Sequence, residues 1–445
     1  MIETLPYFGL ALAAFGLNIP CGYFREGSPK FSTKWFLWIH ASIPVIIFLR
    51  IFWHTSPLAI PVWIFLAVYG QIIGGKKRRA KMTVQEQEAL QQIPPLLDAG
   101  SNPPGIADKD VMVTLLNMGG PRTNEEVPVF LKRIFLDPII LRFPLSMILQ
   151  PFFAWMLVTF RQKGVRERYK LIGGASPIYD ATQAQAQALK AELSRRGRAF
   201  DTAFSFNYSD PLPDQTIDEV KDAGKTHILP LSLYPHYSKA TTGSNLHYLT
   251  KAAEARYPQV RFLSAVPYYL HDDYIAAFVD RIKEQAGEGE SLNDFYLLFS
   301  AHGLPLYFLT EGDPYPFQIA QTTARILEKL GRRKKWALSY QSAVGPLQWL
   351  KPSTDDMLTA LARRGIKKIV VVPVSFVTDH IETLCEIDIE YRHFAQNLGI
   401  EDFRMSKALE CHPGFISALA DAVEASLPRT PQDAREVPAE QHAAR

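Results

Sequence analysis

The segment from Asp379 to Tyr391, DHIETLCEIDIEY, carries five carboxylates and one histidine within thirteen residues. At helical spacing, Glu382, Glu386 and Glu390 recur every four residues and therefore share one face. Like charges at this spacing repel one another, so the chain must either expose this face to solvent or use its carboxylates. Carboxylate oxygens can bind a divalent cation or pass protons, and His380 lies at the head of this glutamate column.

Two further loops follow apolar runs and carry polar side chains. His302 lies in SAHGLP, directly after DFYLLFS, and Tyr234 lies in LYPHYSKATTGSN, after HILPLS. A histidine and a carboxylate at the ends of two strands can transfer a proton or bind a metal ion. Each feature also has a purely structural explanation, because Asp379 and Glu382 form a capping box and His302 fits an ordinary loop. The glutamate column likewise fits a solvated helix face.

Several other kinds of chemistry are disfavoured because the required residues are missing. Cys21, Cys385 and Cys411 form no CxxC pair and are too few for a four-cysteine iron–sulfur cluster. No set of histidines and cysteines has the spacing of a structural zinc site, and Ser300 lacks the GxSxG elbow of a hydrolase. MGGP lacks the later residues of a phosphate-binding loop. The net charge of +3 is too small to indicate a nucleic-acid partner.

The elements that must position these loops begin at Val111, where short apolar runs alternate with amphipathic helical patterns. This alternation predicts an α/β fold with parallel sheets covered on both faces. Segment 219–235 resembles segment 361–377, because both run from a helix end through glycine and a basic residue into an apolar strand with Pro-x-Ser. We therefore predict two similar Rossmann-like halves, 111–275 and 276–428, with ligands bound beyond the carboxyl ends of the strands. The last helix of the second half is expected to pack back on the first.

The first 81 residues have a different composition. The stretches 6–24, 35–53 and 57–75 contain one charged residue between them, Arg50, and each is long enough to span a bilayer. The loop between the first two stretches and the segment 76–81 are basic, whereas the turn 54–56 has no Lys or Arg. The positive-inside rule then predicts a membrane anchor, 1–81, of about three transmembrane helices with an outer N-terminus. We expect 82–110 to be a linker and 429–445 to be a disordered tail.

Long motifs between Val111 and Val423 carry a resemblance to one enzyme family. They are LLNMGGPRTNEEVPVFLKRIFLDPIIL, RYKLIGGASPI, YPHYSKATTGS, FSAHGLP, EGDPYPFQIAQT, YQSAVGPLQWLKPSTDD and PVSFVTDHIETLCEIDIEY. These motifs resemble those of ferrochelatase, which inserts ferrous iron into a porphyrin to make haem. The resemblance implies two similar chelatase-type halves with the anionic tetrapyrrole between them, in agreement with the internal repeat.

The resemblance also implies which residues form the site. His302 matches the family's active-site histidine, and Glu382 matches its partner glutamate across the cleft. We expect both to be catalytic and, together with Glu386 and Glu390, to bind the metal ion. The residues expected to contact the porphyrin are Met118, Arg161, Tyr208, Tyr234, Trp349, Phe376, Asp379 and His380.

The chain departs from the family's pattern at two places. Asn207-Tyr208 replaces the common Arg-Tyr or Lys-His pair, which weakens the expected contact to metal or propionate. Lys239 stands where cluster-bearing members have a cysteine, and no cysteine-rich tail follows. We therefore expect no iron–sulfur cluster and no tightly bound cofactor, with Fe²⁺ as a substrate.

The sequence thus predicts a multi-pass enzyme of the inner (cytoplasmic) membrane, with its catalytic domain in the cytoplasm, that inserts Fe²⁺ into protoporphyrin IX. Alternatives are a chelatase for coproporphyrin or cobalt, and a membrane-tethered haem or metal carrier, against which the retained His302 and Glu382 argue. A histidine in a largely apolar cleft is expected to stay neutral near pH 7 and to accept a pyrrole proton. Nothing in the sequence fixes the oligomeric state.

The stretch Phe143–Phe160 contains eighteen uncharged residues and is long enough for a fourth membrane span. A fourth crossing would place LLNMGGP on the opposite side of the membrane from the motifs that it must meet. We therefore interpret this stretch as an apolar lip of the porphyrin cleft that can rest on a membrane surface.

Overall fold

The computed structural model describes residues 5–26, 33–53, 55–56, 60–79, 102–103, 105–140, 146–332, 334–345 and 347–427. The chain divides into two compact units, Met1–Gln92 and Ile93–Arg445. Most of the expected linker 82–110 and the whole expected tail 429–445 lie outside the described residues.

The first unit contains the helices α1 (Leu5–Glu26), α2 (Thr33–His40), α3 (Ile43–Phe52) and α4 (Ile60–Arg79). α1 and α4 pack closely because glycines lie at their contact. A Cβ added at Gly22, Gly70 or Gly74 would lie within 2.3 Å of a backbone oxygen on the opposite helix. Among the described residues, the segment Trp35–Phe52 is long and apolar enough to cross a membrane, judged by length and composition alone, and Ile60–Gly74 is a shorter apolar helix.

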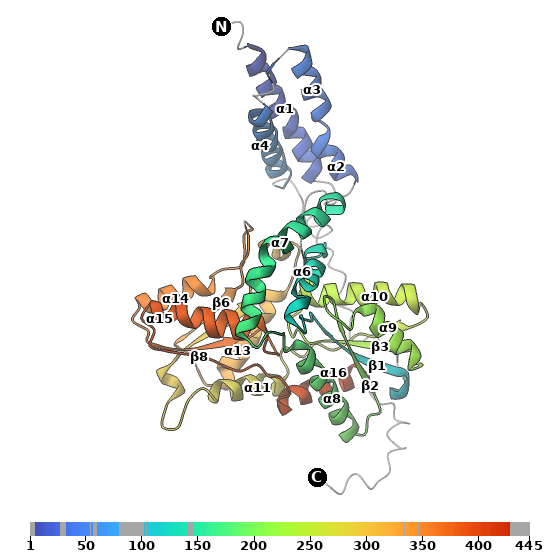
Figure 1. The fold of residues 1–445 in the computed structure, drawn as a ribbon, viewed down its shortest axis with the longest axis vertical. Coiled ribbons are helices and arrows are strands. Elements are labelled where there is room, and N and C mark those ends of the chain that lie inside the picture. Colours follow the sequence, from blue (N-terminus) through green and yellow to red (C-terminus); the bar gives the residue numbers. More distant parts are fainter. Residues whose placement is uncertain are drawn as a thin grey trace. The chain divides into compact units, whose positions relative to one another are not determined.

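The second unit contains two four-stranded parallel sheets with the same strand order (Figure 1). The first sheet has the order β2-β1-β3-β4 and the second has β6-β5-β7-β8. The strands are β1 (Val111–Asn117), β2 (Asp201–Phe206), β3 (His227–Ser232), β4 (Arg261–Phe262), β5 (Tyr296–His302), β6 (Trp336–Gln341), β7 (Lys368–Pro373) and β8 (Asp402–Met405). The shared order confirms the predicted α/β fold with two similar halves, and it places the repeated segments in β3 and β7.

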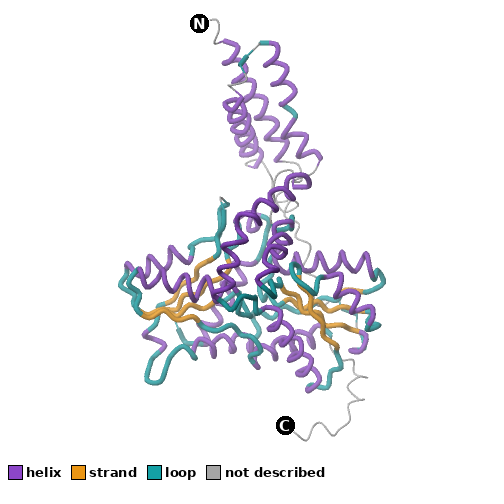
Figure 2. Tube along the Cα trace, in the orientation of Figure 1, coloured by secondary structure: helices purple, strands orange, loops and turns teal. Residues whose placement is uncertain are grey.

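Helices cover both faces of each sheet (Figure 2). One shared core joins the two halves, because Val113 of β1 and Leu297 of β5 lie in the same buried cluster. Helices α8 (Ile178–Arg195), α11 (Asp272–Lys283), α13 (Tyr315–Lys329) and α16 (Pro413–Ser426) contribute to that cluster. On the outer faces, α9 (Pro213–Asp222) and α10 (Ser244–Arg256) cover the first sheet, while α14 (Thr354–Arg363) and α15 (Arg392–Asn397) cover the second. Strand residues alternate between these cores, as the period of a β-strand requires.

The helices α6 (Val127–Leu136) and α7 (Ser146–Leu171) form a pair that belongs to the second unit. Phe135 of α6 and Tyr169 of α7 lie in one buried cluster between them. α7 also presents Trp155 and Phe160 to the outside, with 63% and 79% of their surfaces exposed. Residues 141–145, at the start of the predicted lip, lie outside the described residues. The rest of that stretch is the first part of a helix packed within the α/β unit, and its contact with a membrane stays a prediction.

The remaining short elements of the second unit connect these helices and strands. They are η3 (Asp108–Asp110), η4 (Asn124–Glu126), the π-helix η5 (Lys239–Gly243), η6 (Leu292–Asp294), α12 (Leu306–Thr310) and the π-helix η7 (Ile381–Tyr391).

Candidate active site

The candidate site forms where two neighbouring strands end. His302 is the last residue of β5, and residues 374–380 follow β7, which pairs with β5. Because parallel neighbours end at the same edge of a sheet, their loops meet there. The backbone N–H of His302 donates to Ser375 Oγ at 2.9 Å and so joins the two strand ends directly.

Glu382 lies between two histidines at this edge. Its Oε1 is 3.4 Å from Nε2 of His302, and its Oε2 is 3.3 Å from Nε2 of His380. The carboxylate of Glu382 therefore faces the histidines, and the capping-box explanation for this residue does not apply. The other ring nitrogen of His302, Nδ1, lies 2.5 Å from the carbonyl oxygen of Gly303. Acceptors thus face both ring nitrogens of His302, an arrangement that suits the doubly protonated imidazolium.

The protonation state of His302 in this pair differs from the neutral state that we expected. Burial alone would lower the pKa of His302, but the charge and hydrogen bond of Glu382 raise it to about 9. Burial alone would raise the pKa of Glu382, but the positive charge of His302 and hydrogen bonds from both histidines hold it well below its ordinary value. For the site without porphyrin, the raised pKa of His302 therefore favours an imidazolium–carboxylate pair over the neutral imidazole that we expected. An imidazolium must lose a proton before it can accept one.

The glutamate column lies on η7, which is a π-helix, whereas its spacing had been interpreted as that of an ordinary helix. Glu386, half-buried, accepts hydrogen bonds from Ser342 Oγ at 2.7 Å and Tyr391 OH at 3.3 Å. Burial and the charge of Glu382 raise the pKa of Glu386. Glu390 pairs with Arg168 of α7, whose Nη2 lies 2.6 Å from Glu390 Oε2. The column thus begins at a histidine–carboxylate pair and ends at an ion pair with the neighbouring half.

Two of the aromatic residues expected to contact the porphyrin, Phe376 and Trp349, lie near the histidines. The ring of Phe376 has its centroid 6.3 Å from that of His302 and 4.7 Å from that of His380. Trp349 lies beside Gly303, where an added Cβ would be 3.2 Å from the indole ring and 2.6 Å from the carbonyl oxygen of Gln341. Glycine at 303 therefore permits the close approach of Trp349 to the loop that carries His302.

The expected contacts from the first half occupy different environments. Burial and then the negative charge of Glu382 raise the pKa of Tyr234, so this tyrosine lies within electrostatic range of Glu382. Met118 follows β1, and its carbonyl oxygen accepts the backbone N–H of Tyr208 at 3.2 Å. Tyr208 is only 4% exposed and its hydroxyl donates to Asp137 at 2.5 Å, so that hydroxyl is engaged inside the protein.

Arg161, the basic residue expected near the porphyrin carboxylates, is exposed on α7. Within the described part of the chain, no hydrogen bond or ion pair joins it to His302 or Glu382.

The sequence interpretation missed several residues around the glutamate column. Arg168 pairs with Glu390, and the neighbouring Tyr169 is buried close enough to Glu382 that the carboxylate's charge adds to the raised pKa of the phenol. Both residues lie in the motif RYKLIGGASPI, which could have indicated them. Tyr315, whose hydroxyl donates to the carbonyl oxygen of His302 at 2.9 Å, was missed although it lies in EGDPYPFQIAQT.

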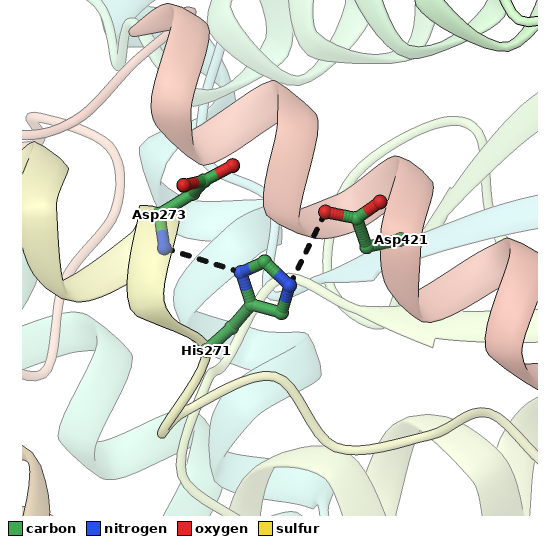
Figure 3. Close-up of side chains that lie close together, drawn as sticks. All are labelled: His271, Asp273 and Asp421. Carbon is green, nitrogen blue, oxygen red and sulfur yellow. Dashed lines mark hydrogen bonds and ion pairs between the residues drawn. The ribbon is translucent and has the colours of Figure 1, made fainter.

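A second group of metal-ligand side chains has a structural explanation (Figure 3). His271, Asp273 and Asp421 place one potential ligand atom each within 4.8 Å of the others. Nδ1 of His271 accepts the backbone N–H of Asp273 as the N-cap of α11, and its Nε2 lies 3.2 Å from Asp421 Oδ2. Arg196 also binds Asp421, at 2.5 Å. These contacts fasten α11 to α16, so the group needs no metal ion to account for it.

Comparisons with known proteins agree with the motifs. The Ferrochelatase family model matches residues 111–427. The ferrochelatase of Synechococcus elongatus is 42% identical over 321 residues, covering 71% of this chain and 82% of its own. The ferrochelatase of Gloeobacter violaceus is 38% identical over 322 residues, covering 72% of this chain and 98% of its own. Among solved structures, SirB from Bacillus subtilis with Fe³⁺ has a TM-score of 0.43 at 17% identity and covers 56% of this chain and 89% of its own.

Proposed function

The chain belongs to the ferrochelatase family and inserts iron into a porphyrin in haem biosynthesis, and from this premise we propose that its porphyrin is protoporphyrin IX. The exposed apolar side chains of α7, among them Phe152, Trp155 and Phe160, support this choice. Protoporphyrin carries fewer carboxylates than coproporphyrin, so apolar contacts contribute more to its binding.

We propose that His302 and Glu382 carry out the proton transfers of the reaction. The observation that carries this proposal is the placement of Glu382 between His302 and His380, at 3.4 and 3.3 Å. Iron insertion releases the two pyrrole N–H protons of the ring, so the site needs a base and a way to remove protons. His302 passes its resting proton through Glu382 toward His380, and its neutral Nε2 then accepts the first pyrrole proton. Once that proton has left by the same route, Nε2 accepts the second.

The proposed route for the Fe²⁺ substrate is the glutamate column. Glu386 and Glu390 supply oxygen ligands on the way to His302 and Glu382, and Arg168 must release Glu390 when a cation enters. The proposed porphyrin contacts are Met118, Tyr234, Trp349, Phe376, Asp379 and His380. Binding of the ring periphery by these side chains would supply the strain that puckers the ring toward the metal. Tyr208 and Arg161 have less support, because the hydroxyl of one is engaged and the other has no described contact to the pair.

We also propose that the enzyme works without an iron–sulfur cluster. Where cluster-bearing relatives have a cysteine, Lys239 donates to the carbonyl oxygen of Glu311 at 3.0 Å and lies 3.6 Å from its carboxylate. The chain has three cysteines, too few for a four-cysteine cluster.

The first unit is proposed to be a multi-pass anchor in the inner (cytoplasmic) membrane, with spans at α1, α2–α3 and α4. Its side chains support this, because Phe48 and Phe65 are largely exposed whereas Asn18, Ser42 and Gln71 are buried. Asn18 Oδ1 accepts from Ser42 Oγ at 2.9 Å and from Gln71 Nε2 at 3.0 Å. Apolar groups outside and paired polar groups inside are what a lipid environment favours. By the positive-inside rule, the basic segment 76–81 supports a cytoplasmic location for the enzyme unit.

The test is an anaerobic assay of Fe²⁺ insertion by the full chain in lipid nanodiscs, with protoporphyrin and coproporphyrin offered side by side. A higher kcat/KM for protoporphyrin is expected, and a preference for coproporphyrin would overturn the proposed ring. Co²⁺ in a parallel series tests the metal. Stoichiometric porphyrin binding without turnover would indicate a carrier.

A further inference from the structure

Glu410 is a half-buried acidic residue that neither the catalytic pair nor the glutamate column uses. It lies between β8 and α16 and has a backbone φ of +48°. Residues other than glycine, asparagine and aspartate rarely adopt this left-handed backbone conformation, and contacts with the surrounding structure must hold them in it.

The side chain and backbone of Glu410 bind the turn of residues 374–380, which is called the catalytic turn because it leads from β7 into η7 and Glu382. Glu410 Oε1 accepts the backbone N–H of Asp379 at 2.7 Å, and the N–H of Glu410 donates to the carbonyl oxygen of Val377 at 2.8 Å. Asp379 in turn accepts the hydroxyl of Thr383 at 3.0 Å, next to Glu382. The start of η7 is therefore fastened to the loop of Glu410.

The first half of the enzyme reinforces this contact through Gln185 of α8, which is fully buried. Its Nε2 donates to Thr378 Oγ1 at 3.1 Å and to the carbonyl oxygen of Glu410 at 3.2 Å. One side chain thus holds both the catalytic turn and the loop of Glu410. The turn cannot shift without breaking hydrogen bonds of buried groups, which is costly.

We propose that Glu410 is a positioning residue for iron insertion: by accepting the Asp379 amide, its carboxylate fixes the turn that places Glu382 between His302 and His380. This inference rests on the proposed catalytic pair. It assigns Glu410 no contact with porphyrin or iron. Small displacements of reacting groups are costly, so losing this anchor should slow turnover without weakening porphyrin binding.

The charges around Glu410 give the proposal a pH signature. Burial raises its pKa to about 7, together with the charge of Asp379, whereas the Asp379 amide, His380 and Arg281 act in the opposite direction. The thiol of Cys411 is the adjoining titratable group. An ionised carboxylate accepts an amide more strongly than a neutral carboxyl does, so the turn is held more firmly above about pH 7.

The experiment compares Glu410→Gly and Glu410→Gln with the wild-type full chain. Glycine relieves the left-handed strain but removes the acceptor of the Asp379 amide, so the two effects on the melting temperature oppose each other and it should stay close to that of the wild type, while kcat falls at least about tenfold. The KM for porphyrin should stay within about twofold. Glutamine keeps Oε1 as an acceptor, so most of kcat should survive, but the change in kcat near pH 7 should disappear. Lys335→Gly is the matched control, because Lys335 also has a left-handed backbone, with φ +57°, and should leave kcat unchanged.

Wild-type kcat in a folded Glu410→Gly variant would overturn the proposal, as would a glutamine variant that loses as much kcat as the glycine variant. If the glycine variant does not fold, the pH profile of the glutamine variant decides, and an unchanged profile counts against the role. Glu382→Gln is measured alongside. Normal iron insertion by that variant would refute the proposed catalytic pair, whereas failure of Glu410 alone leaves the pair intact.

Discussion

Oε1 of Glu382 lies 3.4 Å from Nε2 of His302, so the proposed base of the reaction already belongs to an ion pair before any substrate arrives. Two groups so close titrate as a unit, and removing either one changes the proton affinity of the other. The first two predictions follow from this coupling.

His302→Ala is expected to lower kcat for iron insertion by at least about a hundredfold, because the variant lacks the group that accepts the pyrrole proton. Porphyrin affinity should stay within a few-fold of wild type, since most contact area comes from aromatic and apolar side chains. Anaerobic insertion assays and fluorescence titration of the porphyrin measure the two effects. His247→Ala, at an exposed histidine of α10, is the control. Normal turnover by His302→Ala would end the assignment.

The second prediction concerns pH. The pKa of His302 is raised to about 9, so the wild-type kcat/KM should rise with pH toward that value as the imidazolium loses its proton. Glu382→Gln removes the charge that raises this pKa, while the burial that lowers it remains. In the variant, kcat should be severely depressed, and the rise of the residual kcat/KM with pH should shift to below the ordinary histidine pKa of 6.5. A rise that stays near pH 9 in this variant would show that Glu382 does not control the pKa of His302.

Glu386→Gln and Glu390→Gln are expected to raise the apparent KM for Fe²⁺ several-fold and to leave porphyrin affinity intact, because both supply oxygen ligands on the proposed route. Arg168→Gln should lower that KM, since it frees Glu390 from its ion pair at 2.6 Å. Glu401→Gln, at a surface glutamate that pairs with Lys367, is the control. If the glutamine variants of Glu386 and Glu390 change the melting temperature but not the apparent KM for Fe²⁺, these two residues are only a solvated helix face.

Deleting Met1–Lys81 should give a protein that is easier to extract and retains its kcat, because the family match begins at Val111. Weak liposome binding should remain through α7 and fall when Trp155 and Phe160 are both changed to Gln. Flotation assays and insertion rates measure these effects. Complete loss of activity in a folded truncated protein would show that the spans take part in substrate delivery.

The last prediction links Glu410 to stability. Its pKa is raised from 4.5 to about 7, so the folded state binds more protons than the unfolded state within this window. The contribution of Glu410 to the free energy of unfolding is therefore greatest below pH 4.5 and is lost as the pH rises to 7, by on the order of 3 kcal/mol at most. The free energy of unfolding, measured by denaturant melts at several pH values in this range, should fall more steeply with pH in the wild type than in Glu410→Gln. Parallel curves would show that the carboxyl titrates normally.

Local patterns in the sequence determined much of this protein. Apolar strands alternating with helices predicted two similar α/β halves, because each strand of a covered parallel sheet needs a continuous apolar run. Long motifs around His302 and Glu382 indicated the enzyme family, and three apolar stretches with a single charged residue, Arg50, indicated an apolar N-terminal unit. These features are encoded by neighbouring residues, so they can be read without distances.

The tertiary structure decided what depends on distance and burial. It made η7 a π-helix, placed Glu382 between two histidines and so raised the pKa of His302, and engaged the hydroxyl of Tyr208 with Asp137. It also brought Glu410 into hydrogen-bond contact with the Asp379 amide of the catalytic turn, although an acidic residue in a loop gave no sequence signal. Proton affinities and hydrogen-bond partners are set by groups far apart in the chain, and only folding brings those groups within a few ångströms of one another.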